Sequence, residues 1–236
     1  MKINKKAVVL LSGGLDSAVT LDIARIREGF DCRCLIFDYG QRHKKEIIAA
    51  KKVAEAAGCP YTLLKIKLPW GGSSLLDKEM GVSSRDNQIT RQRANAIPST
   101  YVPARNIIFL SYALSYAEAI GAGAVFIGAH AQDYSGYPDC RPLFLRAFSK
   151  AAARGTKCGS EGSGIRIKAP LLNKTKSGII ALGLKLKTDF ALTRSCYNAG
   201  KYPCGKCDSC YYREKGFREA KAIDPALPAS LRKGKQ

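Results

Sequence analysis

The sequence is poor in histidine and lacks any long hydrophobic stretch. Its two histidines, His43 and His130, lie too far apart in the sequence to indicate a histidine metal pair, so His130 is at most a candidate acid or base. No apolar run approaches the roughly 18 residues that a membrane-spanning helix needs. The amino-terminal residues lead directly into an expected strand and a glycine turn. We therefore expect a cytoplasmic protein without a membrane partner.

Acidic residues are also scarce, with 19 Asp and Glu against 39 Lys and Arg, which gives a net charge of +20. Such an excess suits a polyanionic partner such as a nucleotide, a tRNA or an acidic surface. It is equally typical of a basic, solvated exterior, and the scattered lysines favour that second interpretation. A nucleic-acid partner is therefore not expected.

Strand-length apolar segments alternate with segments of helical periodicity along the 236 residues. Strands are predicted at 7–11, 32–37, 61–66, 124–127 and 165–169. Helices are predicted at 16–28, 44–57, 106–120, 143–154 and 175–186. This alternation predicts an α/β fold, a doubly wound parallel sheet with helices on both faces and right-handed crossovers.

Nine cysteines are present, an odd number that argues against a disulfide framework in the expected reducing compartment. Five are widely spread, and the other four, Cys196, Cys204, Cys207 and Cys210, lie within fifteen positions. Their Cys-x2-Cys steps can direct four thiolates at one structural Zn²⁺. An iron–sulfur cluster or four free thiols are the alternatives. A zinc-binding segment is thus predicted at the carboxyl-terminal end.

The segment Ser12-Gly13-Gly14-Leu15-Asp16-Ser17 joins the first expected strand to the first expected helix. Glycines let this turn approach a ligand closely, and the helix amino terminus favours a phosphate. Asp16 or Ser17 is the expected N-cap. The segment matches neither the P-loop nor the dinucleotide-binding pattern.

The hexamer SGGLDS does resemble the loop of the N-type ATP pyrophosphatases, which cleave ATP between the α and β phosphates. The resemblance implies an adenine nucleotide α-hydrolase-like fold and an ATP-binding stretch. That stretch comprises Leu11, Ser12, Gly13, Gly14, Leu15, Asp16, Ser17, Ala18, Val19, Thr20 and Leu21.

Further strings narrow the resemblance. They are FDYGQRH at 37–43, YVPARN at 101–106, DYSGYPDCRP at 133–142, SCYN at 195–198 and CGKCDSC at 204–210. Together with SGGLDS they are similar to the QueC family, the 7-cyano-7-deazaguanine synthases. The chain departs from that family where Ala104 replaces a common glycine.

The resemblance implies an ATP-dependent conversion of 7-carboxy-7-deazaguanine and ammonia to a nitrile. ATP, Mg²⁺ and structural Zn²⁺ are the implied cofactors, and a homodimer is the implied assembly. Asp16, Ser17 and Lys176 are the expected catalytic residues. The expected substrate-binding residues are Arg105, Asn106, Asp133, Tyr134, Tyr137, Asp139 and Arg141.

Each of these residues also has an ordinary structural interpretation. Lys176 could be a solvated lysine in a first helical turn, Arg105 and Asn106 could serve as a helix cap and a surface ion pair, and the loop residues could be turn formers. Two other functions are open: a tRNA-modifying enzyme on the same scaffold and a non-catalytic zinc-ribbon adaptor.

The expected division of the chain is an ATP pyrophosphatase domain over 1–190, a zinc-binding segment over 191–230 packed on it, and a tail over 231–236. Two long polar loops interrupt the pattern, at 67–101 and 129–142. The first is expected to form either an active-site lid or a dimer contact. The second leaves the carboxyl end of a strand, where open α/β sheets bind ligands.

Overall fold

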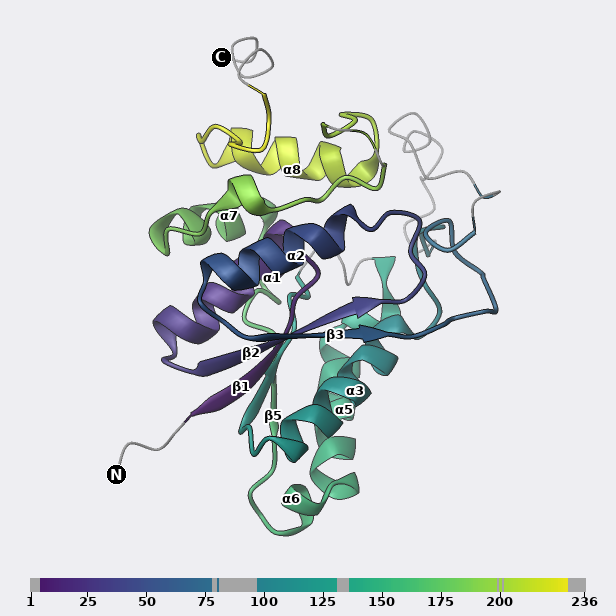
Figure 1. Ribbon diagram of the computed structural model, residues 1–236, viewed down its shortest axis with the longest axis vertical. Helices are drawn as coiled ribbons and strands as arrows, with labels where there is room; N and C mark the ends of the chain where they lie inside the picture. The colour runs from purple at the N-terminus through teal and green to yellow at the C-terminus, as the bar shows by residue number, and fades with distance from the viewer. Residues whose placement is uncertain are drawn as a thin grey trace.

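One parallel sheet runs through the centre of the molecule, with helices on both sides (Figure 1). The computed structural model describes residues 5–77, 80, 97–130, 136–198, 200 and 202–228. Within these ranges the strands are β1 (Lys6–Leu10), β2 (Asp31–Asp38), β3 (Tyr61–Lys65), β4 (Ala124–Phe126) and β5 (Arg166–Lys168). All pairs are parallel, in the order β3-β2-β1-β4-β5. The predicted α/β class is confirmed.

The helices follow the strands in alternation. They are α1 (Leu15–Asp22) with its π-helical continuation η1 (Ile23–Arg27), α2 (Lys45–Ala56), α3 (Arg105–Ala119), η3 (Pro138–Cys140), α5 (Pro142–Gly155), α6 (Lys157–Ser160), α7 (Lys176–Lys185), η4 (Phe190–Leu192) and α8 (Asp208–Glu219). The sequence patterns did not predict α8. Within the described ranges, no helix is both long enough and apolar enough to cross a bilayer.

The start of α1 corrects one expectation. Gly14 is the N-cap residue, with φ −78° and ψ 163°, and the helix begins at Leu15. Asp16 and Ser17 therefore lie inside the first turn, and neither is the cap. Their side chains are consequently free of that role and are directed to other partners.

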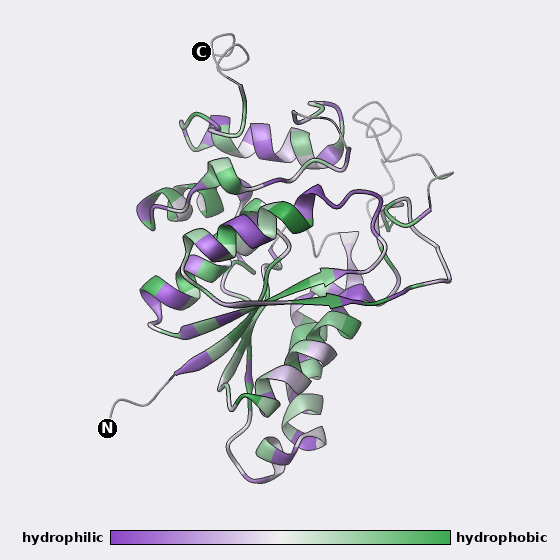
Figure 2. Ribbon diagram, viewed as in Figure 1, coloured by the Kyte–Doolittle hydropathy of each residue, from purple (hydrophilic) through white to green (hydrophobic). Residues whose placement is uncertain are grey.

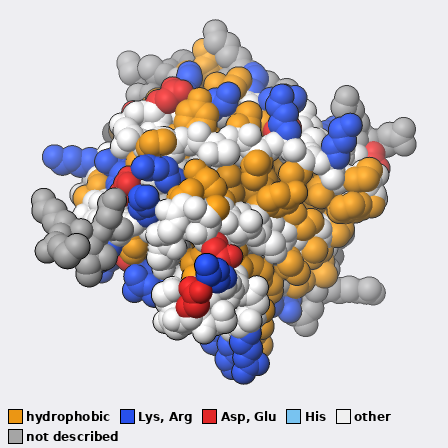
Figure 3. Space-filling view, turned by 60° about the horizontal axis from the view of Figure 1, so that its bottom comes forward, with side chains coloured by type: hydrophobic (Ala, Val, Ile, Leu, Met, Phe, Trp, Pro, Cys, Tyr) orange, Lys and Arg blue, Asp and Glu red, His pale blue; other side chains and the backbone are white. Residues whose placement is uncertain are grey.

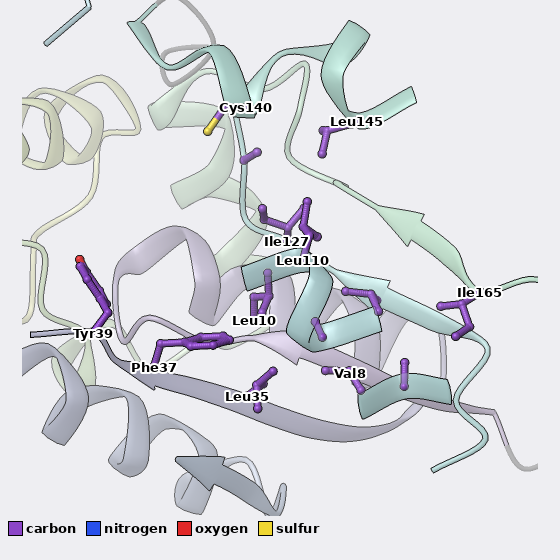
Figure 4. Close-up of a cluster of buried hydrophobic side chains, with 14 of the residues drawn as sticks. Val8, Leu10, Leu35, Phe37, Tyr39, Leu110, Ile127, Cys140, Leu145 and Ile165 are labelled. Carbon is purple, nitrogen blue, oxygen red and sulfur yellow. The ribbon is translucent and has the colours of Figure 1, made fainter. Parts of the chain in front are cut away.

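Alternate residues of the strands fill two separate cores, because both faces of a parallel sheet are buried. Val8, Leu35 and Phe37 face α3, as Figure 4 shows, while Val9 and Ile36 face α1 and α2. A third core joins α1, α7 and α8. Figure 2 shows a largely hydrophobic α3 and a more hydrophilic α8, which lies farther from the sheet.

The packing of α7 depends on a glycine. A Cβ on Gly183 would lie 2.4 Å from Cζ of Phe190 and 2.8 Å from Cγ2 of Val19. Only a residue without a side chain lets α7 lie this close to α1. Lys176 is the first residue of α7, so the packing of this helix sets the position of Lys176.

The strand order reverses direction between β1 and β4, which is where open α/β sheets bind ligands. The carboxyl ends of β1, β4 and β5 meet at one edge of the sheet. The SGGLDS loop, the residues after β4 and the segment leading to α7 therefore converge there. The expected tail at 231–236 lies outside the described residues, and the expected boundary between 190 and 191 stays a prediction.

Candidate functional site

The SGGLDS loop is held by its own hydroxyl groups. Ser17 Oγ accepts from the backbone N–H of Ser12 at 3.2 Å and donates to Gly14 O at 2.9 Å. Gly13 has a φ of +80°, and a Cβ there would lie 2.3 Å from the carbonyl oxygen of Glu46. Both the backbone conformation and the close contact with α2 require glycine at this position.

Asp16, His130 and Lys176, here called the Asp16 cluster, meet at the edge of the sheet. Lys176 Nζ lies 2.8 Å and 2.9 Å from the two carboxylate oxygens of Asp16. The same nitrogen lies 2.9 Å from His130 Nε2, which is 3.6 Å from Asp16 Oδ2. Asp16 and Lys176, two of the expected catalytic residues, are thus in direct contact, and His130, which was not among the expected site residues, joins them.

Electrostatics favour the charged form of Asp16. Burial by itself would raise the pKa of Asp16, but the Lys176 ammonium and His130 outweigh it and hold that pKa well below its usual range. A hydrogen bond joins Lys176 Nζ to His130 Nε2, and an ammonium group at Lys176 is the donor in it. The cluster therefore presents a fixed ammonium group beside the nucleotide loop.

The predicted ATP-binding stretch divides into two parts. Leu11, Ser12, Gly14, Asp16 and Ser17 line a cavity of about 280 Å³. The side chains of Leu15, Ala18, Val19 and Leu21 are buried in the hydrophobic cores. Ser12, Gly14 and the first N–H groups of α1 are therefore the groups of this stretch that could hold a phosphate.

The cavity continues from the loop to an aromatic surface between β2 and α3. Phe37 and Phe109 are stacked with centroids 3.9 Å apart, and Tyr39 meets Phe109 edge-on at 5.4 Å. Arg105 Nη1 donates to the Tyr39 hydroxyl at 3.2 Å and lies over the Tyr39 ring. Burial raises the pKa of Tyr39 to about 12, so its phenol stays neutral near pH 7. This part of the cavity suits a flat ring.

The predicted substrate-binding residues are only partly brought together. Arg105, Asn106 and Tyr137 line the cavity. Asp139 is buried, and its Oδ2 accepts the backbone N–H of Asn106 at 2.9 Å, so it caps α3. Arg141 is exposed at the N-cap of α5 and does not line the cavity. Asp133 and Tyr134 lie outside the described residues.

The four cysteines form one compact group, here called the cysteine cluster. The Sγ atoms of Cys196, Cys204, Cys207 and Cys210 all lie within 4.8 Å of one another. Backbone N–H groups of Lys206 and Cys207 donate to Cys204 Sγ at 3.4 Å. Burial would raise the pKa of Cys204, but these N–H groups outweigh it and lower that pKa. Four cysteine sulfurs this close together can hold one metal ion.

The amino-terminal end of helix α8 carries two residues of the cysteine cluster. Cys207 is the N-cap of α8 and Cys210 lies in its first turn, where the helix dipole favours thiolates. Arg213 on α8 is buried and forms a two-pronged ion pair with Asp224, at 2.6 Å and 2.9 Å. It also donates to the Thr193 hydroxyl at 2.8 Å. These contacts fix the segment that carries the cysteines.

The two clusters share a contact between helices. A Cβ on Gly216 of α8 would lie 2.5 Å from Cγ of Lys176. In addition, the backbone N–H of Arg194 donates to Gly13 O at 2.8 Å, and Cys196 lines the same cavity as Ser12. The cysteine-bearing segment therefore forms one wall of the nucleotide site.

A family model described as "Queuosine biosynthesis protein QueC" matches residues 6–221. The chain belongs to the QueC family. A 7-cyano-7-deazaguanine synthase from Anaeromyxobacter sp. (strain Fw109-5) is 50% identical over 226 residues, covering 94% of this chain and 96% of that protein. One from Methylococcus capsulatus is 51% identical over 225 residues, covering 94% and 97%.

Among solved structures, NMN synthetase from Francisella tularensis superposes with a TM-score of 0.49 at 15% identity, covering 96% of this chain and 80% of that chain. Membership of the QueC family confirms the resemblance that the motifs indicated. It also favours the synthase over the tRNA-modifying enzyme and the adaptor.

Two groups were not among the site residues expected from the sequence. His130 was considered only as a candidate acid or base, although it lies three residues after the expected strand at 124–127, where open α/β sheets bind ligands. Glu46, in the first turn of α2, lines the cavity, but a charged residue at the start of a helix gives no signal of its own.

Proposed function

We propose that this chain converts 7-carboxy-7-deazaguanine and ammonia to 7-cyano-7-deazaguanine at the expense of ATP. The observation that carries the proposal is the single cavity in which the SGGLDS loop and Asp16 adjoin a flat aromatic surface with Arg105. A nucleotide phosphate and a deazapurine ring could bind there side by side. The high identity to 7-cyano-7-deazaguanine synthases supports the same reaction.

The chemistry requires two activations. A carboxylate oxygen attacks the α phosphorus of ATP, pyrophosphate leaves, and ammonia then displaces AMP to give the amide. In the second round the amide oxygen attacks another ATP. Loss of the nitrogen-bound protons and departure of AMP, which carries away the oxygen, leave the nitrile.

The Asp16 cluster would serve both rounds. The Lys176 ammonium lies where it can balance negative charge that develops on the departing pyrophosphate, and Asp16 holds it there. Ser17 keeps the loop in shape through Ser12 and Gly14. Mg²⁺, if held by Asp16 together with nucleotide oxygens, would supply further charge neutralisation.

The cysteine cluster would hold a structural Zn²⁺. Sulfurs at about 2.3 Å from one tetrahedral zinc ion lie about 3.8 Å apart. Cys204 Sγ and Cys210 Sγ are separated by 3.9 Å, which fits that arrangement. Four protein ligands leave no open position for water, so the ion would stabilise the segment and take no part in the reaction.

A homodimer is the proposed assembly. Hydrophobic side chains gather over part of the face in Figure 3, and Ile107, Tyr112 and Leu143 on α3 and α5 are exposed. Exposed apolar surface of this kind is typical of a protein contact. Sedimentation analysis of the wild type and Leu143→Asp tests this: a dimer that becomes a monomer supports it, and a monomeric wild type excludes it.

The activity itself is tested by incubating the chain with 7-carboxy-7-deazaguanine, ATP, Mg²⁺ and ammonium chloride. Mass spectrometry should detect the amide first and the nitrile later, with AMP and pyrophosphate formed in each round. Omitting ammonium should stop the reaction at the adenylated acid. If no AMP is released when all components are present, the proposed function is wrong.

A further inference from the structure

One carboxylate of the cavity has no role in the chemistry above. Among the described residues that line the cavity, Asp16 and Glu46 are the carboxylates. Both oxygens of Asp16 are engaged by Lys176. Glu46 lies in the first turn of α2, and neither activation step uses its side chain.

The backbone of Glu46 is fixed by the nucleotide loop. Its carbonyl oxygen lies where a Cβ on Gly13 would come within 2.3 Å, so α2 and the loop are in direct contact. Glu46 also lines the cavity, together with Tyr39 and Arg105. A ring bound beside those two residues would lie in the same cavity as Glu46.

Two neighbours keep the Glu46 side chain in place. Gln41 bonds to its carboxylate and is itself fixed, because Gln41 Oε1 accepts from the N–H of Tyr39 at 2.8 Å and Gln41 Nε2 donates to Phe37 O at 3.1 Å. Arg105 faces it from α3. Burial raises the pKa of Glu46, while the charge of Arg105 and the bond from Gln41 oppose that rise.

The chemistry of the proposed substrate matches this carboxylate. The edge of a 7-deazaguanine ring presents two adjacent donors, the N1–H and the 2-amino group, and a carboxylate presents two acceptors in one plane. Asp139, the other described candidate for this edge, has one oxygen on the backbone N–H of Asn106. Phe37 and Phe109, whose rings are stacked, line the same cavity as Glu46.

We propose that the Glu46 carboxylate recognises the N1–H and 2-amino edge of the deazapurine and so determines which ring the enzyme accepts. This inference rests on the proposed function and adds a specificity-determining residue to it. It distinguishes the 2-amino-6-oxo ring from rings that lack the 2-amino group.

The test compares two substrates in two variants. Glu46→Gln keeps the shape of the side chain but replaces one acceptor with a donor. Glu55→Gln, at an exposed position of the same helix, is the matched control. Binding of 7-carboxy-7-deazaguanine, and of its analogue without the 2-amino group, is measured by calorimetry in the absence of ATP, and kcat/KM is measured with both.

Glu46→Gln should weaken binding and lower kcat/KM for 7-carboxy-7-deazaguanine by roughly 10- to 100-fold, as expected for loss of a charge-assisted hydrogen bond. The analogue should lose much less, and the KM for ATP should not change. The Glu55→Gln variant should match the wild type with both compounds.

Equal losses with the two compounds would show that Glu46 only shapes the cavity and would overturn the inference. A selective loss in Asp133→Asn, with none in Glu46→Gln, would assign the edge to Asp133 instead. A wild type that binds the acid but forms no nitrile contradicts the proposed reaction alone, because the binding comparison still decides the role of Glu46.

Discussion

The Asp16 cluster and the cysteine cluster adjoin one site but are built in opposite ways. The members of the Asp16 cluster are separated by 114 residues between Asp16 and His130 and by 46 between His130 and Lys176. The four cysteines lie within fifteen consecutive positions. Long-range topology assembles the first cluster, whereas local turns and the start of α8 assemble the second.

This difference suggests that the Asp16 cluster serves the reaction and that the cysteine cluster stabilises the fold. Asp16 lines the cavity and forms an ion pair with Lys176 beside the SGGLDS loop. The four cysteine sulfurs lie close to one another, and those of Cys196 and Cys204 accept hydrogen bonds from backbone N–H groups. We therefore expect substitutions in the Asp16 cluster to lower the rate without unfolding the chain, and substitutions in the cysteine cluster to do the reverse.

The largest effect on the rate should come from Lys176→Met. It removes the positive charge that balances the departing pyrophosphate, so kcat/KM for the acid should fall about 10³-fold. Lys185→Met, at the exposed end of the same helix, should leave the rate unchanged. Pyrophosphate release measures the rate of each variant, and thermal unfolding measures its stability. A Lys176→Met protein that unfolds early, or that keeps its rate, would break the comparison.

A substitution in the cysteine cluster should lower the stability of the chain. In Cys207→Ser the bound metal should fall from one ion per chain to nearly none, and the free energy of unfolding should drop by about 3 kcal/mol or more. Elemental analysis and denaturant unfolding measure the two effects. Cys158→Ser, a cysteine outside the cluster, should retain the metal. Iron with a visible absorption band, in place of zinc, would refute the proposed ion.

A weaker effect tests whether one site serves both activations. Ser17→Ala should slow conversion of acid to amide and of amide to nitrile together, by roughly 10-fold if the hydroxyl contributes about 1.4 kcal/mol in each transition state. Synthetic amide supplied with ATP should yield nitrile without ammonium. Slowing of only one half-reaction would mean that the two activations do not share the loop.

The smallest expected change is an increase in the free energy of unfolding. Ala104 has a φ of +55° directly before α3, in the left-handed region that costs a non-glycine residue free energy. Ala104→Gly should raise the free energy of unfolding by about 0.5 kcal/mol, because relief of strain exceeds the added entropy of the unfolded chain. Chemical denaturation measures this free energy of unfolding. A lower value in Ala104→Gly than in the wild type would contradict the prediction and would mean that contacts of Arg105 and Asn106 already offset the strain at Ala104.

Much of the fold could be predicted from the sequence because its signals are local. Hydrophobic periodicity located the strands within one or two residues, for example 61–66 against the observed Tyr61–Lys65. Helix α8 was missed because the cysteine motif that precedes it indicated a metal site and because most residues of the helix are polar. The N-cap of α1 was misplaced by two residues because a glycine took that position.

The sequence by itself determined the glycine-rich SGGLDS loop, the alternation of strands and helices and the grouping of four cysteines, since each depends on residues that are close together in the chain. The tertiary structure decided which distant residues join them. The strand order β3-β2-β1-β4-β5 brings His130 and Lys176 to Asp16, and the contact of α2 with Gly13 brings Glu46 to the cavity. Spacing along the chain contains no record of strand order, because that order arises from packing between segments far apart in sequence.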